Sequence, residues 1–382
     1  MAKRTGGFIG QDGINAPDPA TGVTASGGDG QASVSFTSPS DEGGAAVTGY
    51  RVQSNDGIGA SGSASPIAVT GLTNGTSYTF NVWAINPFGW SSPSDASGSV
   101  SPQGVAALFQ SNYEIAKITI SSTGNAVDYG DLTARNGTGG VGNATIMALG
   151  GGTGPSSLIE YGTYASGGSF ASWGNLANQK RFLAGAGNNT RGLFNGGSDG
   201  SARFSSTDYI TYSSTGSVSD FGNSGTAHGD SGCTAAASTT RAIFAGGESS
   251  QNTRTSVIDY CTISSTGSFS SFGNLIQGET LPGGCSNSTR AVFAGGGETT
   301  NRIQYLTISS TGNATDFGDL TVGRAGPSGL ASSTRAVFAS GASSNVMDYI
   351  TISSTGNATD FGDALGSDAG QGGSSNGHGG LS

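Results

Sequence analysis

One pattern, repeated along most of the chain, limits what this sequence can fold into more than any other feature. An aromatic residue followed by glycine recurs every 44 to 51 residues, at Tyr129, Trp173, Phe221, Phe272, Phe317 and Phe361. The segment TRAIFAGG at residues 240–247 also recurs, with small changes, at residues 190–197, 289–296 and 334–341. Such a period, built from short strands and turns, is typical of β-propellers, because each small sheet buries its faces only against neighbouring sheets. The six pairs predict six blades.

The order of residues within each repeat resembles that of the kelch repeat. An apolar strand ends in two glycines, and a tyrosine, a Ser-Ser-Thr-Gly turn and the aromatic residue follow, with Phe-Gly in most copies where kelch repeats have Trp. The resemblance implies an all-β, six-bladed kelch-like β-propeller over residues 105–382. The first copy begins at residues 105–109 without an inner strand, whereas residues 373–379 have no partner. We therefore expect the C-terminal strand to close the first blade and remove its open edge.

Between residues 17 and 102 the chain has a different pattern, in which apolar and polar residues alternate. Val34 and Phe36, for example, lie two residues apart and so face the same side of a sheet. The segment GLTNGTSY at residues 71–78 resembles fibronectin type III domains, in which that leucine and tyrosine form a tyrosine corner. The resemblance implies a fibronectin type III-like sandwich over residues 17–102, and residues 1–16 precede it as an N-terminal arm.

The composition favours β-structure and argues against several partners. The 382 residues include 69 glycines and only 10% are charged, which suits short strands joined by tight turns. The formal net charge of -10 repels nucleic-acid phosphates and anionic membrane surfaces. No apolar run approaches the roughly 18 residues of a membrane span, and none follows Lys3 and Arg4 as a signal peptide requires. We therefore expect no nucleic-acid partner, no membrane insertion and no signal peptide.

The connections between predicted strands fall on two faces of the propeller, because the strands of a blade are antiparallel. Turns on one face are nearly identical from copy to copy, whereas loops on the other differ in length and chemistry. We predict that binding takes place on the face with the varied loops. Its candidate residues are Arg181, Phe182, Arg203, Phe204, Glu248, Arg254, Glu279, Glu298 and Arg302. Phe182 and Phe204 are the expected anchors for a sugar or protein, and the alternative for each is a hydrophobic plug beneath a long loop.

Other repeated residues have structural roles in this interpretation. Four equivalent arginines cannot all belong to one catalytic site, so we expect them to pair with carboxylates of the same blades, although Gln304 leaves the fifth blade without one. The arginines are Arg191, Arg241, Arg290 and Arg335, and the carboxylates are Asp208, Asp259 and Asp348. The three cysteines, Cys233, Cys261 and Cys285, lack the spacing of a zinc site or a disulfide scaffold. We expect buried free thiols.

Two enzyme families with propellers share part of this pattern. Copper-radical galactose oxidases resemble it in combining a kelch propeller with a sandwich, but their metal site needs two histidines, two tyrosines and a cysteine close together. Here the only histidines are His228 and His378, and six blades are predicted in place of seven. Sialidases also have six blades, but the aspartate of their Asp-box turns is missing from the Ser-Ser-Thr-Gly turns. We therefore predict no catalytic residue, cofactor or metal.

The combination of an arm, a fibronectin type III module and Ser-Ser-Thr-Gly repeats ending in SNGHGGL resembles a family of marine bacteriophage structural proteins. The resemblance implies a non-enzymatic virion surface protein, either a capsid decoration or a tail fibre or adaptor component, made in the host cytoplasm. The arm and sandwich would dock on other virion proteins, and the propeller would contact a host surface glycan or protein. A bacterial surface adhesin and a glycan hydrolase are the alternatives. The sequence predicts no particular oligomeric state.

Overall fold

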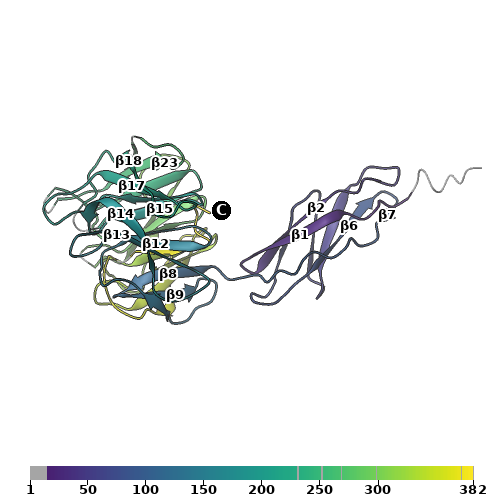
Figure 1. Ribbon diagram of the computed structural model, residues 1–382, viewed down its shortest axis with the longest axis horizontal. Coiled ribbons are helices and arrows are strands. Elements are labelled where there is room, and N and C mark those ends of the chain that lie inside the picture. Colours follow the sequence, from purple (N-terminus) through teal and green to yellow (C-terminus); the bar gives the residue numbers. More distant parts are fainter. Residues whose placement is uncertain are drawn as a thin grey trace, which may run out of the picture. The chain divides into compact units, whose positions relative to one another are not determined.

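The computed structural model describes residues 15–229, 232–250, 253–267, 269–297, 299–370 and 372–381. All regular secondary structure in these ranges is β-strand (Figure 1), and they contain no helix long and apolar enough to cross a membrane. The chain divides into two compact units, one ending at Gly104 and one beginning at Val105. The predicted arm lies outside the described residues except for Asn15 and Ala16.

The first unit consists of two antiparallel sheets that pack on each other. One has the order β1 (Thr21–Gly28), β2 (Gln31–Thr37), β5 (Ile67–Thr70), and the other β4 (Gly59–Gly62), β3 (Gly49–Ser54), β6 (Phe80–Asn86), β7 (Gly89–Trp90). Alternate residues of each strand point inward, and Val34, Val52 and Phe80 are fully buried between the sheets. The predicted alternation therefore forms the core of a sandwich.

The tyrosine corner expected in this unit is present. The Tyr78 hydroxyl accepts a hydrogen bond of 2.9 Å from the Thr73 backbone N–H, and both Tyr78 and Leu72 are buried. The bond ties the chain before β6 to the turn that follows β5. It therefore fixes the crossing between the two sheets.

Removal of this hydroxyl should destabilise the first unit. We expect Tyr78→Phe to lower its free energy of unfolding by about 1 kcal/mol, because the Thr73 N–H loses its acceptor while the ring stays in place. Urea unfolding of residues 15–104 measures the change. Tyr50→Phe is the matched control, because Tyr50 is equally buried and its hydroxyl donates only to a serine hydroxyl, that of Ser38. Equal losses in the two variants would contradict a special role for the corner.

Within its described residues, the second unit contains six four-stranded antiparallel sheets and one short hairpin. From the innermost strand outward, the sheets are β33 (Gly373–Ser375), β8 (Ala106–Ser111), β9 (Glu114–Thr119), β10 (Val127–Asp131); β11 (Gly139–Gly142), β12 (Ile146–Gly150), β13 (Ser156–Thr163), β14 (Ala171–Lys180); β15 (Ala184–Gly187), β16 (Arg191–Asn195), β17 (Ser206–Thr211), β18 (Val218–Asn223); β19 (Thr234–Ala237), β20 (Arg241–Ala245), β23 (Val257–Thr262), β24 (Ser270–Asn274); β25 (Gly283–Ser286), β26 (Arg290–Ala294), β27 (Arg302–Thr307), β28 (Thr315–Asp319); and β29 (Ser328–Ala331), β30 (Arg335–Ala339), β31 (Val346–Thr351), β32 (Thr359–Asp363). The hairpin is β21 (Glu248–Ser250) with β22 (Thr253–Arg254).

The first of these sheets combines strands from the two ends of the unit. Strand β33 near the C-terminus pairs with β8, so that Ser374 lies opposite Leu108. This is the pairing expected from the missing inner strand of the first repeat. The innermost strands contact one another in the order β11, β15, β19, β25, β29 and β33, and β33 returns to β11.

The repeated sequence motif forms the contact between neighbouring sheets. In four of the Ser-Ser-Thr-Gly turns the glycine donates its N–H to the carbonyl of the aromatic residue in the preceding sheet, as Gly312 does to Phe272 at 2.9 Å. The glycine after that aromatic is required, because a Cβ on Gly273 would lie 2.2 Å from the Gly312 oxygen. The same bond, from Gly124 to Phe361 at 2.8 Å, links the sixth sheet to the first. The residues of the repeated motif therefore form the contacts through which neighbouring sheets pack on each other.

The repeated arginines do not pair with the aspartates, and the sequence expectation is wrong on this point. Each guanidinium carbon lies 4.3 to 4.7 Å from the centroid of a tyrosine ring, the partners being Tyr209, Tyr260, Tyr305 and Tyr349. Each Nη1 also donates to an isoleucine carbonyl: Ile263, Ile308, Ile352 and Ile120. The register explains the difference, because Arg191 lies opposite Thr211 while Asp208 lies opposite Phe194, and Asp208 and Tyr209 face opposite sides of the sheet.

Candidate binding face

Two kinds of loop lie together at one edge of the six sheets. One kind joins the second and third strands of a sheet, and the other joins the outermost strand to the next sheet; in antiparallel order both end at the same edge. We call this edge the variable face. The opposite edge carries the Ser-Ser-Thr-Gly turns, whose N–H groups are used in the bonds between sheets.

Four buried contacts between a basic residue and a carboxylate lie beneath the variable face. Each joins a basic residue that ends the outermost strand of one sheet, or follows it in the loop between sheets, to a carboxylate on the third strand of the following sheet. The pairs are Arg135 with Glu160 at 2.5 Å, Lys180 with Asp208 at 3.3 Å, His228 with Asp259 at 3.1 Å, and Arg324 with Asp348 at 2.7 Å. A buried charge needs a partner of opposite sign, so each pair fixes its loop on the sheet below.

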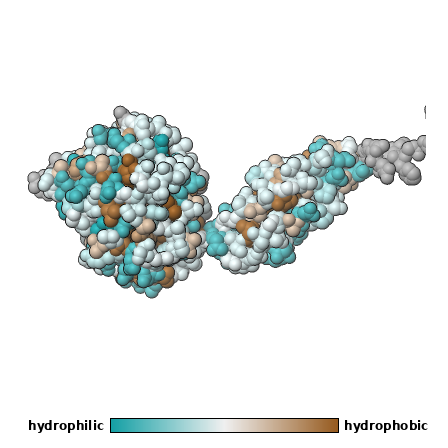
Figure 2. Space-filling model, viewed as in Figure 1, coloured by the Kyte–Doolittle hydropathy of each residue, from teal (hydrophilic) through white to brown (hydrophobic). Residues whose placement is uncertain are grey.

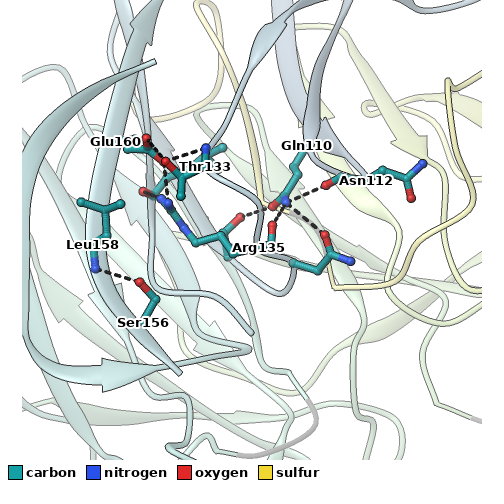
Figure 3. Close-up of polar contacts among 10 residues, drawn as sticks. Gln110, Asn112, Thr133, Arg135, Ser156, Leu158 and Glu160 are labelled. Carbon is teal, nitrogen blue, oxygen red and sulfur yellow. Dashed lines mark hydrogen bonds and ion pairs between the residues drawn. The ribbon is translucent and has the colours of Figure 1, made fainter. Parts of the chain in front are cut away.

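Figure 3 shows how the first pair is built into its surroundings. The guanidinium of Arg135 points to Glu160, whose carboxylate also accepts a bond of 2.8 Å from the Thr133 hydroxyl. The Gln110 side-chain amide donates to the Arg135 carbonyl and, at 2.8 Å, to that of Asn112. Burial lowers the pKa of Arg135, and Glu160 opposes that shift. Burial likewise lowers the pKa of Lys180, against the effect of Asp208.

The sequence analysis did not identify these basic partners, although a signal was present. The residue seven positions after an aromatic of the aromatic–glycine pair is Lys180, His228, Glu279, Arg324 or Asp368, and Arg135 lies six positions after Tyr129. Where the third strand carries Gln304 in place of a carboxylate, the loop carries Glu279 in place of a cation. Reading the two positions together would have predicted the pairing.

Two of the predicted binding carboxylates have a structural role. Glu248 is buried and pairs with Arg203 at 3.0 Å, and Glu279 is fully buried and pairs with Arg302 at 3.4 Å. Their charges therefore serve to hold neighbouring segments together, and ligand contact by Glu248 and Glu279 stays a prediction. Arg254 on β22 is exposed. Glu298 lies outside the described residues.

Phe182 takes the alternative role of a plug. Six residues around the centre of the face have left-handed φ values of 52° to 71°: Gly137, Phe182, Gly232, Leu281, Gly326 and Gly370. A Cβ on Gly370 would lie 3.1 Å from both Phe182 Cδ1 and Leu281 Cδ2, so these two side chains meet there. Both line a cavity of about 70 Å³ between the inner strands. The side chains of Phe182 and Leu281 therefore cover the centre of the variable face.

Arg181 and Phe204 also lie against other groups of this face. The Arg181 guanidinium lies 5.4 Å from the centroid of the Phe182 ring, and the Lys180 ammonium lies 5.5 Å from that of Phe204. Both residues are half-buried. Phe204 therefore covers the Lys180–Asp208 pair, and its ring is only partly available to a ligand.

Four exposed apolar side chains on the variable face were not predicted from the sequence. Tyr113 is 53% exposed, Val322 45%, Ile276 44% and Leu365 39%. They lie in the loop between β8 and β9 and in the three loops that lead into the fifth, sixth and first sheets. On the side drawn in Figure 2, apolar residues form separate spots among polar ones. Exposed apolar residues at loop tips are suited to contacts with another molecule.

The cysteines are free and buried, as expected from the sequence. Burial raises the pKa of Cys233 and of Cys261 to about 12. Within the ranges that the structure describes, no group of three histidine, cysteine or acidic side chains is placed to hold a metal ion.

Comparison with known proteins identifies the class of the first unit. Residues 17–99 match the fibronectin type III domain family, so this all-β chain contains a fibronectin type III domain. A crystal structure of domains from titin is similar over 24% of this chain, with 29% sequence identity and a TM-score of 0.23. The similar region spans about a third of that titin chain. No curated protein sequence matches the chain.

Proposed function

We propose that this chain is a non-enzymatic surface protein of a bacteriophage particle, in which a fibronectin type III domain docks on the particle and a six-bladed kelch-like β-propeller faces the host. The observation that carries the binding role is the contrast between the two edges of the six sheets. One edge uses its repeated turns to link sheets, whereas the variable face presents exposed side chains that differ from loop to loop. The assignment to a virion follows the resemblance of the repeats and of the C-terminal SNGHGGL segment.

The six sheets support the propeller interpretation in detail. Each has four antiparallel strands, each contacts the next through its innermost strand, and the chain end completes the first. A kelch-like propeller needs glycines where strands and turns meet closely, and the aromatic–glycine pairs supply them. A capsid decoration and a tail fibre or adaptor component both fit this architecture.

The contacts on the variable face favour a protein or glycan ligand over a reaction centre. Its buried cations are paired with carboxylates of the sheets below, and its exposed residues include apolar side chains and the basic Arg254. Apolar contacts with a few charged residues at their edge are characteristic of binding surfaces. Repeated copies on one particle would multiply a weak contact into stable attachment.

Substitution of exposed residues tests the binding role. We expect the triple variant Ile276→Ser, Val322→Ser, Leu365→Ser to reduce attachment of the purified protein to host cells at least tenfold, because burial of three such side chains contributes several kcal/mol. Stability should change little, since all three are exposed. The matched control is Thr266→Ala, Thr311→Ala, Thr355→Ala, three exposed positions on the opposite edge.

The control also decides between the two edges. If the threonine variant loses attachment and the apolar variant retains it, the binding surface lies on the turn side. If neither the parent nor any variant attaches to cells, the binding role falls and a particle-stabilising role remains. Electron microscopy of virions with labelled antibody tests the particle location separately.

A further inference from the structure

His228 occupies a position where both ring nitrogens face acceptors. Nδ1 lies 2.7 Å from the Gly246 carbonyl oxygen, and Nε2 lies 3.1 Å from Asp259 Oδ2. The imidazole is fully buried. A neutral imidazole has one N–H and a lone pair on its other nitrogen, so only the imidazolium can donate to both oxygens. The surroundings of His228 therefore match its charged form.

The equivalent positions in other sheets show why the charge matters. There the chain places Arg135, Lys180 or Arg324 against the carboxylate of the following sheet, and arginine and lysine stay charged throughout the neutral range. Histidine is the side chain that changes its charge in that range. The His228–Asp259 pair of the fourth sheet therefore differs from the other three pairs beneath the variable face, because a change of pH can remove its positive charge.

Charged groups near the imidazole do not replace the lost charge. From β23, Asp259 faces it directly and also accepts a bond of 3.0 Å from the Thr226 N–H. From the segment after β20, Glu248 is paired with Arg203 of the loop after β16. In that same loop, the exposed Asp199 accepts bonds from backbone N–H groups. In the loop that carries His228, the thiol of Cys233 is neutral because burial raises its pKa, and Asp230 lies outside the described residues.

Two loops of the variable face are hydrogen-bonded to the segment around His228. The backbone of Gly229 exchanges two hydrogen bonds with that of Glu248, of 2.9 and 3.1 Å, and Gly197 donates to the His228 carbonyl at 3.0 Å. Arg203 packs so closely on Gly229 that a Cβ there would lie 2.5 Å from it. The loop after β16 and the β21–β22 hairpin, which carries Arg254, therefore both rest on the segment that His228 fixes.

We propose that His228 stabilises these two loops of the variable face in a pH-dependent way. It orders them when it is charged and releases them when it is neutral. When pH rises through the neutral range, Nδ1 and the Gly246 oxygen become two facing lone pairs, and Asp259 loses its cation. The two loops then open more often, and any ligand that they hold binds more weakly. This last step rests on the proposed binding function; the ordering itself does not.

Nuclear magnetic resonance of the histidine rings tests the charge state. The chain has two histidines, and His378→Asn identifies the signal that belongs to His228. We expect both ring nitrogens of His228 to carry protons at pH 6 and one of them to lose its proton as the pH is raised to 9. A ring that is neutral at pH 6 would overturn the proposal.

Hydrogen exchange measures the effect on the loops. Peptides over residues 224–229 and 246–250 should exchange about tenfold faster, after correction for the intrinsic rate, at pH 9 than at pH 6. In His228→Lys the difference should disappear, because the charge is permanent, and in His228→Gln exchange should be fast at both values. Equal exchange rates in the parent at pH 6 and pH 9 would contradict the proposed role of His228.

A separate measurement distinguishes this inference from the proposed function. Attachment to host cells is compared at pH 6 and pH 9 for the parent and for the two His228 variants. If the parent attaches at neither pH, the binding function fails while the exchange result still decides on His228. If attachment is the same at both values although exchange differs, the fastened loops are not part of the binding surface.

Discussion

Gly185→Val is expected to prevent the second unit from folding. Gly185 lies on the innermost strand of its sheet, where a Cβ would lie 2.1 Å from the Gly140 oxygen and 2.6 Å from its carbonyl carbon. Both atoms belong to the backbone of the neighbouring innermost strand, so no side-chain rotation relieves the overlap. Overpacking in a core costs about 1–3 kcal/mol where side chains can adjust, and a clash with a backbone exceeds that range.

Thermal unfolding measures the effect in the whole chain. We expect the transition of the first unit to remain and that of the second to be lost, with the variant prone to aggregate. Gly312→Val is the matched control, because a Cβ at Gly312 would meet no atom within 4 Å. A Gly185→Val protein that melts like its parent would contradict this close approach of the inner strands.

The same contact recurs around the centre of the second unit. A Cβ on Gly329 would lie 2.3 Å from the Gly284 oxygen, and one on Gly140 would lie 2.5 Å from the Gly373 nitrogen. The glycine-rich composition therefore has a specific cause in this unit: its innermost strands and its turns approach neighbouring backbones directly. The repeat in the sequence marks these positions, and for this reason the number of sheets and the pairing of the chain end could be predicted.

The side-chain partnerships could be predicted only in part. The repeated arginines were expected to contact the aspartates because both recur in several copies, but strand register places the tyrosines within their reach instead. Register decides which of two adjacent residues, such as Asp208 and Tyr209, faces a given neighbour. A repeat pattern records which residues recur, and the face that each one occupies depends on pairing across strands.

Exposure of the charged residues was the least predictable feature of the binding face. Glu248 and Glu279 were selected because they lie in loops that differ in length and chemistry from copy to copy. In a chain with only 10% charged residues, however, most of those in the loops hold neighbouring segments together. The exposed positions are apolar residues such as Ile276 and Val322, which the sequence alone would place in a core.

The Arg324–Asp348 pair allows the role of the buried charges to be measured. Both side chains are fully buried, and the guanidinium donates to the Asp348 carboxylate and to the carbonyls of Ser340, Phe338 and Val322. We expect Arg324→Met to lower the free energy of unfolding of the second unit by about 3–5 kcal/mol, because it leaves a carboxylate buried without its cation. Urea unfolding of residues 105–382 is the measurement.

The double variant distinguishes the net contribution of the ion pair to stability from the penalty of leaving one buried charge without its partner. Arg324→Met with Asp348→Leu removes both charges, so its loss should be smaller than that of Arg324→Met alone, by about 1 kcal/mol or more. The fifth sheet already does without such a cation, since Gln304 faces its loop there and accepts a bond from the Ile276 N–H. Arg203→Met is the control for a pair nearer the surface, and we expect it to cost about 1 kcal/mol or less. If the double variant is as unstable as the sum of its two single variants, the charges act independently, and the loops between sheets are held by packing and backbone bonds instead of by their ion pairs.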